Sequence, residues 1–292
     1  MANIAVVVPT IESRAKIFSV FMKGWSPLFD KHDVTLIKVL DGDEPQVFHD
    51  LKFGMTIEKV MGKHGNCLTN HNGGIRNLGF AYVAKYLKDT DIIITLDDDE
   101  VPIGDTIQDH LDALSRRVPV SWISTAVDEY MRGFPYDIRD EAEVVLSHGV
   151  WEGVADWDAP TQLVKGSHRP VDFYRGPIPK GIYYPMCAMN IAFKPKLLPW
   201  IFQAPWALGV NRYDDIAAGI VSKREIDKNG WAVVTGYART RHERASNVFA
   251  NLVNEAPGIP INETFWQGTE DHEWFKIYRE KLATWQKFLS SV

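Results

Sequence analysis

Residues 91–102 read DIIITLDDDEVP, and this stretch decides which fold the chain adopts. A short apolar run bounded by polar residues is typical of a buried strand in a parallel sheet. Asp97, Asp98, Asp99 and Glu100 follow that run without a break. Because four adjacent carboxylates repel one another, the sequence predicts that water or a cation holds them at the end of the strand.

The residues around this strand alternate between strand-like and helical patterns. Apolar runs at 4–8 and 34–40 predict two further strands, the patterns of 13–24 and 71–88 are helical, and another helix begins at residue 103. Strands that alternate with helices predict a parallel sheet with right-handed crossovers. We therefore expect an α/β fold with a Rossmann-like half, in which a mixed, mostly parallel sheet is flanked by helices.

Polar residues follow each of the three predicted strands. In such sheets, ligands bind beyond the carboxyl ends of the strands. The residues at these ends are Pro9 and Thr10, Asp41 and Asp43, and the triplet Asp97, Asp98 and Asp99. We expect all of them to face one crevice and to form the substrate site.

The acidic triplet has two interpretations. Carboxylate oxygens suit Mg²⁺ or Mn²⁺, and such an ion would neutralise the diphosphate of a nucleotide sugar and help the nucleoside diphosphate to depart. Alternatively, the triplet is a solvated turn that caps the helix at residue 103. The two other polar strand ends favour the metal–diphosphate interpretation.

Three weaker assignments follow from the same crevice. We expect Thr10 and Asp41 to contact the uridine, with helix capping as the alternative. Arg76, in the motif GIRNLGF, either reaches the nucleotide from its helix or makes a surface salt bridge.

Composition and motifs exclude several other classes of protein. The net charge of −6 argues against a broad nucleic-acid surface. No apolar stretch approaches the length that spans a bilayer, and the N-terminus has no basic segment, so we expect a cytoplasmic protein with no membrane partner. The first strand continues into PTIESR without a glycine, which disfavours a flavin or nicotinamide cofactor.

We expect the 292 residues to form a single domain with three parts. Residues 1–120 form a nucleotide-binding half, 121–255 a half for the sugar or acceptor, and 256–292 a C-terminal helical extension. Aromatic residues recur at helical spacing within 270–290. This pattern predicts a helix that packs on the core or on a partner subunit, which leaves a homo-oligomer open.

Long motifs resemble a known family. VVVPTIESR, LDGDEP and ITLDDDEVP resemble the GT-A glycosyltransferases. The second half resembles, in order and spacing, the reversibly glycosylated polypeptides, which are the plant UDP-arabinopyranose mutases. The motifs that carry this resemblance are YMRGFPYDIRDE (130–141), LSHGVWEGVADWDAPTQLVK (146–165), IPKGIYYPMCAMNIAF (178–193), NRYDDIAAGI (211–220) and RHERASNVFANL (241–252).

The resemblance implies a GT-A fold, a divalent metal and interconversion of UDP-arabinopyranose with UDP-arabinofuranose. It also implies reversible glycosylation of an arginine, which matches Arg132, and a second important arginine, which matches Arg139. In GT-A enzymes the last carboxylate of the acidic motif binds the metal, often with a late histidine. Here we expect Asp99, Asp97 and His242 to bind Mn²⁺ or Mg²⁺.

The arginines have two possible roles. A guanidinium stays protonated at ordinary pH, so covalent capture of a sugar needs a carboxylate partner, and Asp214 or Asp215 is the candidate. Alternatively, Arg132 and Arg139 only bind phosphate oxygens.

Two other functions compete with a mutase. One is a UDP-sugar-dependent transferase that acts on an external acceptor, and the other is a self-glycosylating scaffold. Three departures from the plant pattern leave the identity of the sugar open: Glu100 stands where a cysteine is expected, the segment GFPYDIRDEAEVV (133–145) is more acidic, and the C-terminus is shorter.

Overall fold

The structure is a computed structural model that describes residues 2–123, 129–154, 156–167, 172–243 and 246–292. Its five longest strands run in the same direction, and they are β1 (Ile4–Ile11), β2 (Val34–Asp41), β5 (Ile92–Leu96), β8 (Glu141–Gly153) and β11 (Ala232–His242). Shorter strands lie antiparallel to their neighbours, and they are β3 (Gln46–His49), β4 (Gly54–Thr56), β6 (Glu100–Pro102), β7 (Arg117–Pro119), β9 (Gly176–Ile178) and β10 (Asn190–Phe193).

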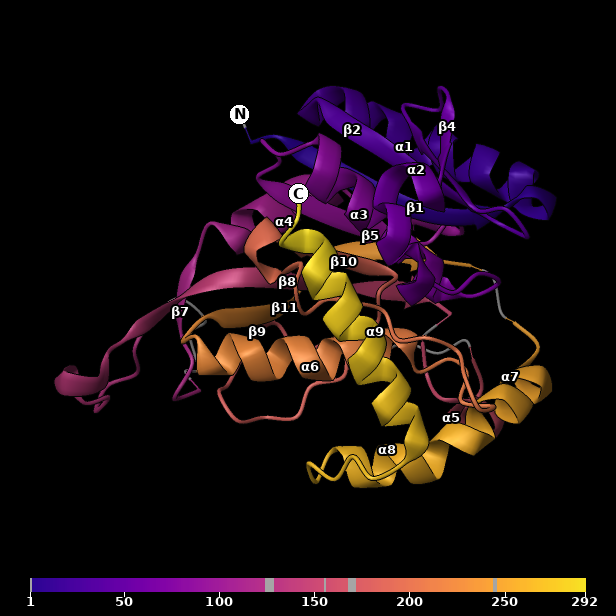
Figure 1. The fold of residues 1–292 in the computed structure, drawn as a ribbon. Coiled ribbons are helices and arrows are strands. Elements are labelled where there is room, and N and C mark those ends of the chain that lie inside the picture. Colours follow the sequence, from indigo (N-terminus) through magenta and orange to yellow (C-terminus); the bar gives the residue numbers. More distant parts are fainter. Residues whose placement is uncertain (1, 124–128, 155, 168–171, 244–245) are drawn as a thin grey trace.

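These described strands form one 11-stranded sheet in the order β4-β3-β2-β1-β5-β10-β8-β11-β6, with β7 paired to β8 and β9 paired to β11 (Figure 1). Because β10 is antiparallel to both β5 and β8, those two strands are parallel to each other. The carboxyl ends of β1, β2, β5 and β8 therefore lie at one edge of the sheet. The predicted α/β fold with a mixed, mostly parallel sheet is confirmed.

Helices cover both faces of the sheet. One face packs against α1 (Ala15–His32) and α4 (Thr106–Leu114), and the other packs against α3 (Arg76–Tyr86), α6 (Asp214–Lys228) and α9 (Glu273–Leu289). Strand β1 shows the alternation that this requires. Ile4, Val6 and Val8 pack on the face covered by α1 and α4, whereas Ala5 and Val7 pack on the face covered by α3, α6 and α9.

Two close contacts fix helices to the sheet. The indole of Trp25 on α1 is fully buried and donates from Nε1 to the carbonyl of Glu100 at 2.9 Å, which ties α1 to β6. Gly79 on α3 lies against β1 and β2, where an added Cβ would come within 2.4 Å of Val7 and 2.9 Å of Val39. The missing side chain lets α3 approach the sheet closely.

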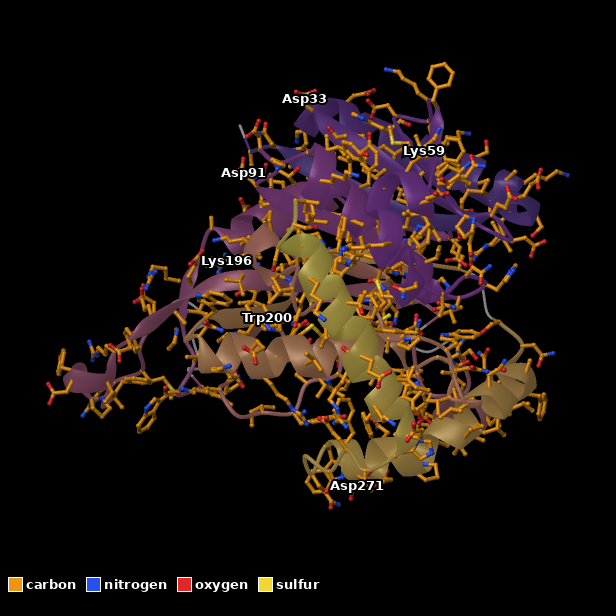
Figure 2. All side chains as sticks on the ribbon, viewed as in Figure 1. Asp33, Lys59, Asp91, Lys196, Trp200 and Asp271 are labelled. Atoms are coloured by element: carbon orange, nitrogen blue, oxygen red, sulfur yellow. The ribbon has the colours of Figure 1, made fainter. Side chains whose placement is uncertain are left out.

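The remaining helices are α2 (Ile57–Met61), α5 (Ala159–Lys165), α7 (Val248–Glu255) and α8 (Ile259–Phe265). The predicted aromatic helix is α9, whose Trp274 and Trp285 are buried and donate to the carbonyls of Pro205 and Leu198. It therefore packs on the core of its own chain. Charged side chains surround the fold, and Asp33, Lys59, Asp91 and Asp271 are exposed (Figure 2).

Candidate functional site

Two adjoining cavities lie at the carboxyl ends of the parallel strands. The first, of about 340 Å³, is lined by residues at the carboxyl ends of β1 and β2 and just after β5, including Pro9, Thr10, Asp41 and Asp98. We call it the strand-end cavity. The predicted convergence of the three strand ends is therefore present in the structure.

The second cavity has a volume of about 420 Å³ and reaches from Asp97 to loops and helix ends of the second half of the chain. We call it the carboxylate cavity. Arg14, Gly73, Arg76 and Asp97 line both cavities, so the two form adjoining parts of one crevice. A crevice at this edge of an open α/β sheet is where ligands of such folds bind.

Arginine neutralises the acidic block at the end of β5. Nη2 of Arg14 lies 2.8 Å from Oδ1 of Asp98 and also contacts Asp99. Thr10 donates its hydroxyl to Asp98 at 2.5 Å. Burial, above all, raises the pKa of Asp98 to about 6 despite these contacts. Burial also acts on Asp99, but His242 and the charge of Arg14 outweigh it and lower the pKa of Asp99.

Arg76 holds the third carboxylate from the opposite side. It is buried, and its Nη2 donates to Asp97 at 2.7 Å, while Nη1 donates to the hydroxyl of Thr95 at 2.8 Å and to the carbonyl of Ala188 at 2.7 Å. Nε donates to the carbonyl of Gly73 at 3.2 Å. Arg76 is therefore not the surface residue of the alternative interpretation, and most of its hydrogen-bonding capacity is already used inside the protein.

Glu100 differs from the three aspartates. Its side chain is fully buried, and neither carboxyl oxygen has a hydrogen-bond partner among the described residues. Burial first, and then the charge of Asp97, raises its pKa well above the usual range. Burial therefore favours the uncharged form of the Glu100 carboxyl and sets it apart from the three aspartates.

His242 and Asp99 offer a pair of ligands for a cation. Nδ1 of His242 donates to the carbonyl of Val154 at 3.0 Å, so Nε2 is the ring atom left to face Asp99, 3.8 Å away. A carbonyl on one ring nitrogen orients the other toward a metal in many sites. Burial lowers the pKa of His242, but the contact with Asp99 outweighs it and raises that pKa.

The predicted set of three metal ligands is not assembled. Within the described ranges, no group of three or more His, Cys, Asp or Glu side chains is arranged to hold a metal, and Asp97 pairs with Arg76 instead. A carboxylate and an imidazole still suit an ion such as Mn²⁺, which commonly takes further ligands from water and phosphate. Arg14 would have to leave Asp99 for such an ion to bind there.

Asp41 organises the wall of the strand-end cavity. It is buried, and its carboxylate accepts from the backbone amides of Gly42 at 2.9 Å, His71 at 2.9 Å and Asn72 at 3.0 Å. It joins the end of β2 to the loop before α3. The side chain of Asp43 is 98% exposed and pairs with His71, and Asp43 does not line the cavity in the described part of the chain.

Asp214 and Asp215 begin α6 and line the carboxylate cavity. Trp206 donates its indole N–H to Asp214 at 3.1 Å, and the amide of Ala188 donates to Asp215 at 3.1 Å. Burial first, and then the charge of Asp214, raises the pKa of Asp215 to about 7. The two predicted carboxylates therefore lie in the crevice, close to Arg76.

Arg132 and Arg139 lie at the other edge of the sheet. Their segment is between β7 and the start of β8, and neither residue lines either cavity. Beyond β7, Lys180 donates to the carbonyl of Val120, and Gly181 donates to Asp227 near the end of α6. The carboxylate cavity lies at the beginning of α6. At 1.5 Å per residue along the helix, that end is roughly 20 Å from Asp227.

Residues 129–140, which we call the arginine segment, project from the body of the protein on the side away from α5 and α7 (Figure 1). Arg132 is exposed. The guanidinium of Arg139 lies 3.8 Å from the ring centre of Tyr136 and donates to the carbonyl of Phe134 at 3.1 Å. The structure therefore does not bring Arg132 and Arg139 together with Asp214 and Asp215.

Sequence reasoning missed three side chains of the crevice. Arg14 lies in the quoted PTIESR motif, where a basic residue after a strand end was the available signal. Asp156 and Arg212 lie in quoted family motifs, but no spacing distinguished them from their neighbours. Arg212 has a left-handed backbone with φ of 60° and pairs with Glu255 at 3.0 Å across the carboxylate cavity.

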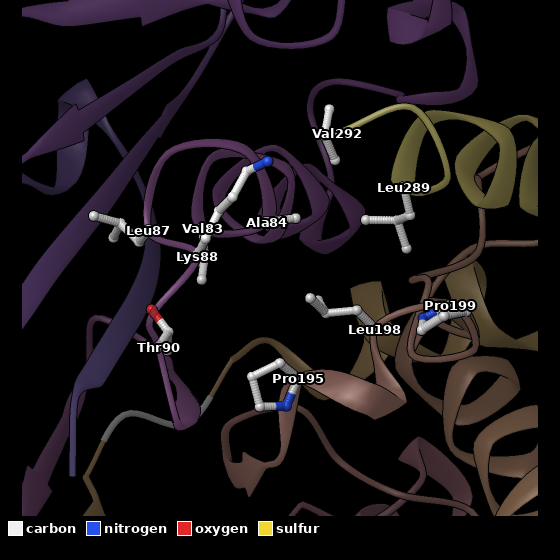
Figure 3. A pocket seen from close by; sticks show the side chains of 10 residues that line it. All are labelled: Val83, Ala84, Leu87, Lys88, Thr90, Pro195, Leu198, Pro199, Leu289 and Val292. Atoms are coloured by element: carbon white, nitrogen blue, oxygen red, sulfur yellow. The ribbon is translucent and has the colours of Figure 1, made fainter.

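A separate cavity of about 300 Å³ lies between the end of α3 and the end of α9 (Figure 3). Its lining is mainly apolar, with Leu87, Leu198, Leu289 and Val292 among the residues, and Lys88 is the charged side chain there. Among the described residues that line it, no titratable side chains face one another, so the crevice with its carboxylates and arginines is the better candidate for chemistry.

Known proteins match most of the chain. A family model described as "Reversibly glycosylated polypeptide" matches residues 1–269. The chain is 32% identical over 282 residues to "Probable UDP-arabinopyranose mutase 4" of Arabidopsis thaliana, a match of 89% of this chain and 75% of that protein. It is 33% identical over 288 residues to "UDP-arabinopyranose mutase 3" of the same plant, with 90% and 75% covered.

Among solved structures, glucosyl-3-phosphoglycerate synthase from Mycobacterium tuberculosis, in complex with phosphoglyceric acid, matches with a TM-score of 0.52 and 14% identity. The match covers 92% of this chain and 81% of that one, and it supports the GT-A fold. In the part of the chain that the structure describes, every helix is too short or too polar to cross a membrane. The family match spans most of the sequence, and the chain therefore belongs to the reversibly glycosylated polypeptide family.

Proposed function

We propose that this protein is a UDP-arabinopyranose mutase, which interconverts UDP-arabinopyranose and UDP-arabinofuranose. The observation that carries the proposal is the two-part crevice, in a chain whose relatives bear that name. The strand-end cavity suits the nucleotide and the carboxylate cavity suits a pentose, because carboxylates accept hydrogen bonds from sugar hydroxyls. Arg14, Arg76 and Asp97 lie between the two parts, where the diphosphate would sit.

The nucleotide contacts follow from the strand ends. We assign Pro9, Thr10 and Asp41 to the uridine, because they line the strand-end cavity. Arg14 is the better diphosphate ligand of the two arginines. Its Nε is buried without a partner among the described residues, whereas Arg76 is held by four hydrogen bonds.

We further propose that Asp99 and His242 hold Mn²⁺ or Mg²⁺ when the nucleotide is bound. The orientation of His242 Nε2 toward Asp99, 3.8 Å away, supports this assignment. Such an ion would supply positive charge to the diphosphate as the bond between C1 and UDP breaks and forms again. Arg14 would then turn from Asp99 toward the diphosphate.

The reaction requires the freed sugar to stay beside UDP, since UDP is both the leaving group and the returning nucleophile. Enclosure of the sugar supplies this proximity. Arg212 and Glu255 span one side of the carboxylate cavity, and Trp157, Cys187 and Met189 line its apolar part.

Glycosylation of Arg132 fits this geometry only between two molecules. Arg132 lies at the opposite edge of the sheet from the cavities of its own chain. We therefore propose that any sugar on Arg132 is transferred from the crevice of another molecule.

The test is to incubate the protein with UDP-arabinofuranose and Mn²⁺ and to separate the sugar nucleotides by chromatography. We expect UDP-arabinopyranose to form and EDTA to stop its formation. Asp99→Ala should lower the rate at least 100-fold. Asp112→Asn, on the exposed side of α4, should keep the rate of the unmodified protein. Net release of UDP, dependent on an added acceptor, with no interconversion, would identify a transferase instead.

A further inference from the structure

Six carboxylates line the carboxylate cavity: Asp97, Asp156, Asp158, Asp214, Asp215 and Glu255. They do not all have the same freedom to act on a substrate. A carboxylate that accepts strong hydrogen bonds within the protein has fewer lone pairs left and is a weaker base. The partners of each group therefore decide which carboxylate is available for proton transfer.

Three of the six carboxylates lie outside α6, and each accepts hydrogen bonds from nitrogen or hydroxyl donors. Asp97 pairs with Arg76 at 2.7 Å. Asp158 caps α5 and accepts from the amide of Thr161 at 2.9 Å and from its hydroxyl at 2.7 Å. Glu255 accepts from Arg212 at 3.0 Å and from the amide of Ala159 at 2.7 Å.

The two carboxylates of α6 are held as well. Asp214 accepts from the indole of Trp206. Both oxygens of Asp215 are used, since Oδ2 accepts from the amide of Ala188 at 3.1 Å and Oδ1 from the amide of Ile216 at 2.8 Å. Asp215 is therefore fixed in orientation by two backbone amides, which leaves it little freedom to turn from one sugar oxygen to another.

Asp156 is different. It follows the end of β8 and is half-buried in the cavity wall. Among the described residues it makes no ion pair and accepts no hydrogen bond from nitrogen or hydroxyl, and its neighbour is the thiol of Cys187, a weak donor. Asp156 lies close enough to Asp215 and Cys187 that its charge raises the pKa of both groups.

The proposed ring interconversion needs one proton to move from one sugar oxygen to another. The pyranose ring closes through O5 and the furanose ring through O4. After UDP departs with the electron pair of the C1–O bond, the 4-hydroxyl adds to C1 and must lose its proton. The C1–O5 bond then breaks, and O5 must gain a proton before UDP returns to C1. No oxidant or reductant is involved.

We propose that the Asp156 carboxylate carries this proton. It accepts the proton of the 4-hydroxyl as O4 bonds to C1, and as a carboxylic acid it returns the proton to O5 as the C1–O5 bond breaks. Asp215 acts only as a fixed acceptor that positions a hydroxyl. This inference rests on the proposed mutase activity and assigns a residue to one step of it.

The step can be separated from the departure of UDP. UDP-arabinopyranose is prepared with ¹⁸O in the bridge between C1 and the β-phosphate. Each reversible break of the C1–O bond lets the phosphate rotate and moves the label to a non-bridging position, which ³¹P NMR detects. Conversion to UDP-arabinofuranose is followed by chromatography in the same sample, so that scrambling and ring interconversion are measured together.

For Asp156→Asn we expect label scrambling to continue within about threefold of the unmodified protein and interconversion to fall at least 100-fold, the usual range for loss of a general base. Asp112→Asn is the control. It removes an exposed carboxylate of α4 that lines neither cavity, so both rates should stay unchanged.

Two outcomes for Asp156→Asn overturn the inference. If interconversion persists, another group carries the proton, and if scrambling and interconversion fall together while UDP still binds, Asp156 acts on UDP departure. An unmodified protein that neither scrambles the label nor interconverts the sugars would overturn the proposed mutase function itself, and the inference with it.

Discussion

The guanidinium of Arg14 lies 2.8 Å from Oδ1 of Asp98 and also contacts Asp99, although 84 and 85 residues separate them in the chain. The segment that follows β1 thus places the positive charge of Arg14 beside the carboxylates at the end of β5. The repulsion within the acidic block is relieved by this arginine and by Arg76, which pairs with Asp97. A metal ion would therefore have to displace an existing partner.

Arg14→Gln should change the binding of metal and nucleotide in opposite directions. With the guanidinium removed, we expect Mn²⁺ to bind the free protein at least fivefold more tightly, which corresponds to roughly 1 kcal/mol. UDP should bind about 10-fold or more weakly, because the diphosphate loses a charged hydrogen-bond donor. Electron paramagnetic resonance of free Mn²⁺ and calorimetry with UDP measure the two effects.

Arg117→Gln is the control for this prediction, since Arg117 lies on β7 at the other edge of the sheet. Both affinities should be unchanged in that variant. Weaker binding of Mn²⁺ in Arg14→Gln would contradict the idea that Arg14 and the metal compete for Asp99.

Asp41→Asn should destabilise the protein, whereas Asp43→Asn should not. The carboxylate of Asp41 accepts from three backbone amides, and an amide side chain cannot replace all three acceptors. We expect a loss of about 1–3 kcal/mol in the free energy of unfolding for Asp41→Asn, measured in urea. For the exposed Asp43 the change should stay within about 0.5 kcal/mol, and equal losses would argue against this role of Asp41.

The protein should lose stability with rising pH through Asp215. Burial first, and then Asp214 and Asp156, raise its pKa to about 7, against the partial compensation of Arg76. A carboxyl whose pKa is raised by folding stabilises the fold fully below the unfolded pKa, and that stabilisation is lost as the pH passes the folded pKa.

Asp215→Asn removes this titration. The difference in unfolding free energy between Asp215→Asn and the unmodified protein should therefore shift in favour of the variant by about 1–3 kcal/mol between pH 5 and pH 8. Urea denaturation at the two pH values measures the shift. A difference that is independent of pH would show that Asp215 titrates normally.

Trp285 should anchor α9 to the rest of the fold. Its ring is fully buried and its indole N–H donates to the carbonyl of Leu198 at 2.8 Å. Trp285→Ala should cost about 3–5 kcal/mol in the free energy of unfolding. Trp266 is 56% exposed, so Trp266→Ala should change it by less than about 0.5 kcal/mol. Similar values for the two variants would exclude this anchoring role.

Any sugar on Arg132 should come from another molecule. We would mix untagged, unmodified protein with tagged Asp99→Ala protein, supply radiolabelled UDP-arabinose, and recover the tagged chains. Label on Arg132 of the inactive tagged chain is expected. Label confined to the active chain would mean that the arginine segment reaches the crevice of its own chain.

The strand ends were predictable because parallel strands that alternate with helices end at one edge of a sheet. Pro9, Thr10, Asp41, Asp97 and Asp98 accordingly meet in one cavity wall. The aromatic spacing near the C-terminus likewise predicted α9, because helical periodicity can be read from the order of residues alone.

Other parts of the site depended on tertiary contacts. Nothing in the spacing of Arg14 places it on Asp98, because the crossover through α1, β2 and α3 brings β1 beside β5. Asp156 could be distinguished from Asp158 only by the helix that Asp158 caps. The resemblance named Arg132 and Arg139, but a motif does not tell which edge of the sheet its loop leaves.

The crevice joins walls of two different origins. The strand-end cavity rests on the ends of β1, β2 and β5, which neighbouring strands hold in register. Much of the carboxylate cavity is built instead by loops and helix ends, such as 156–158 and 206–216. If the proposed function holds, exchanging these short segments should change which sugar the protein binds without weakening its binding of the nucleotide.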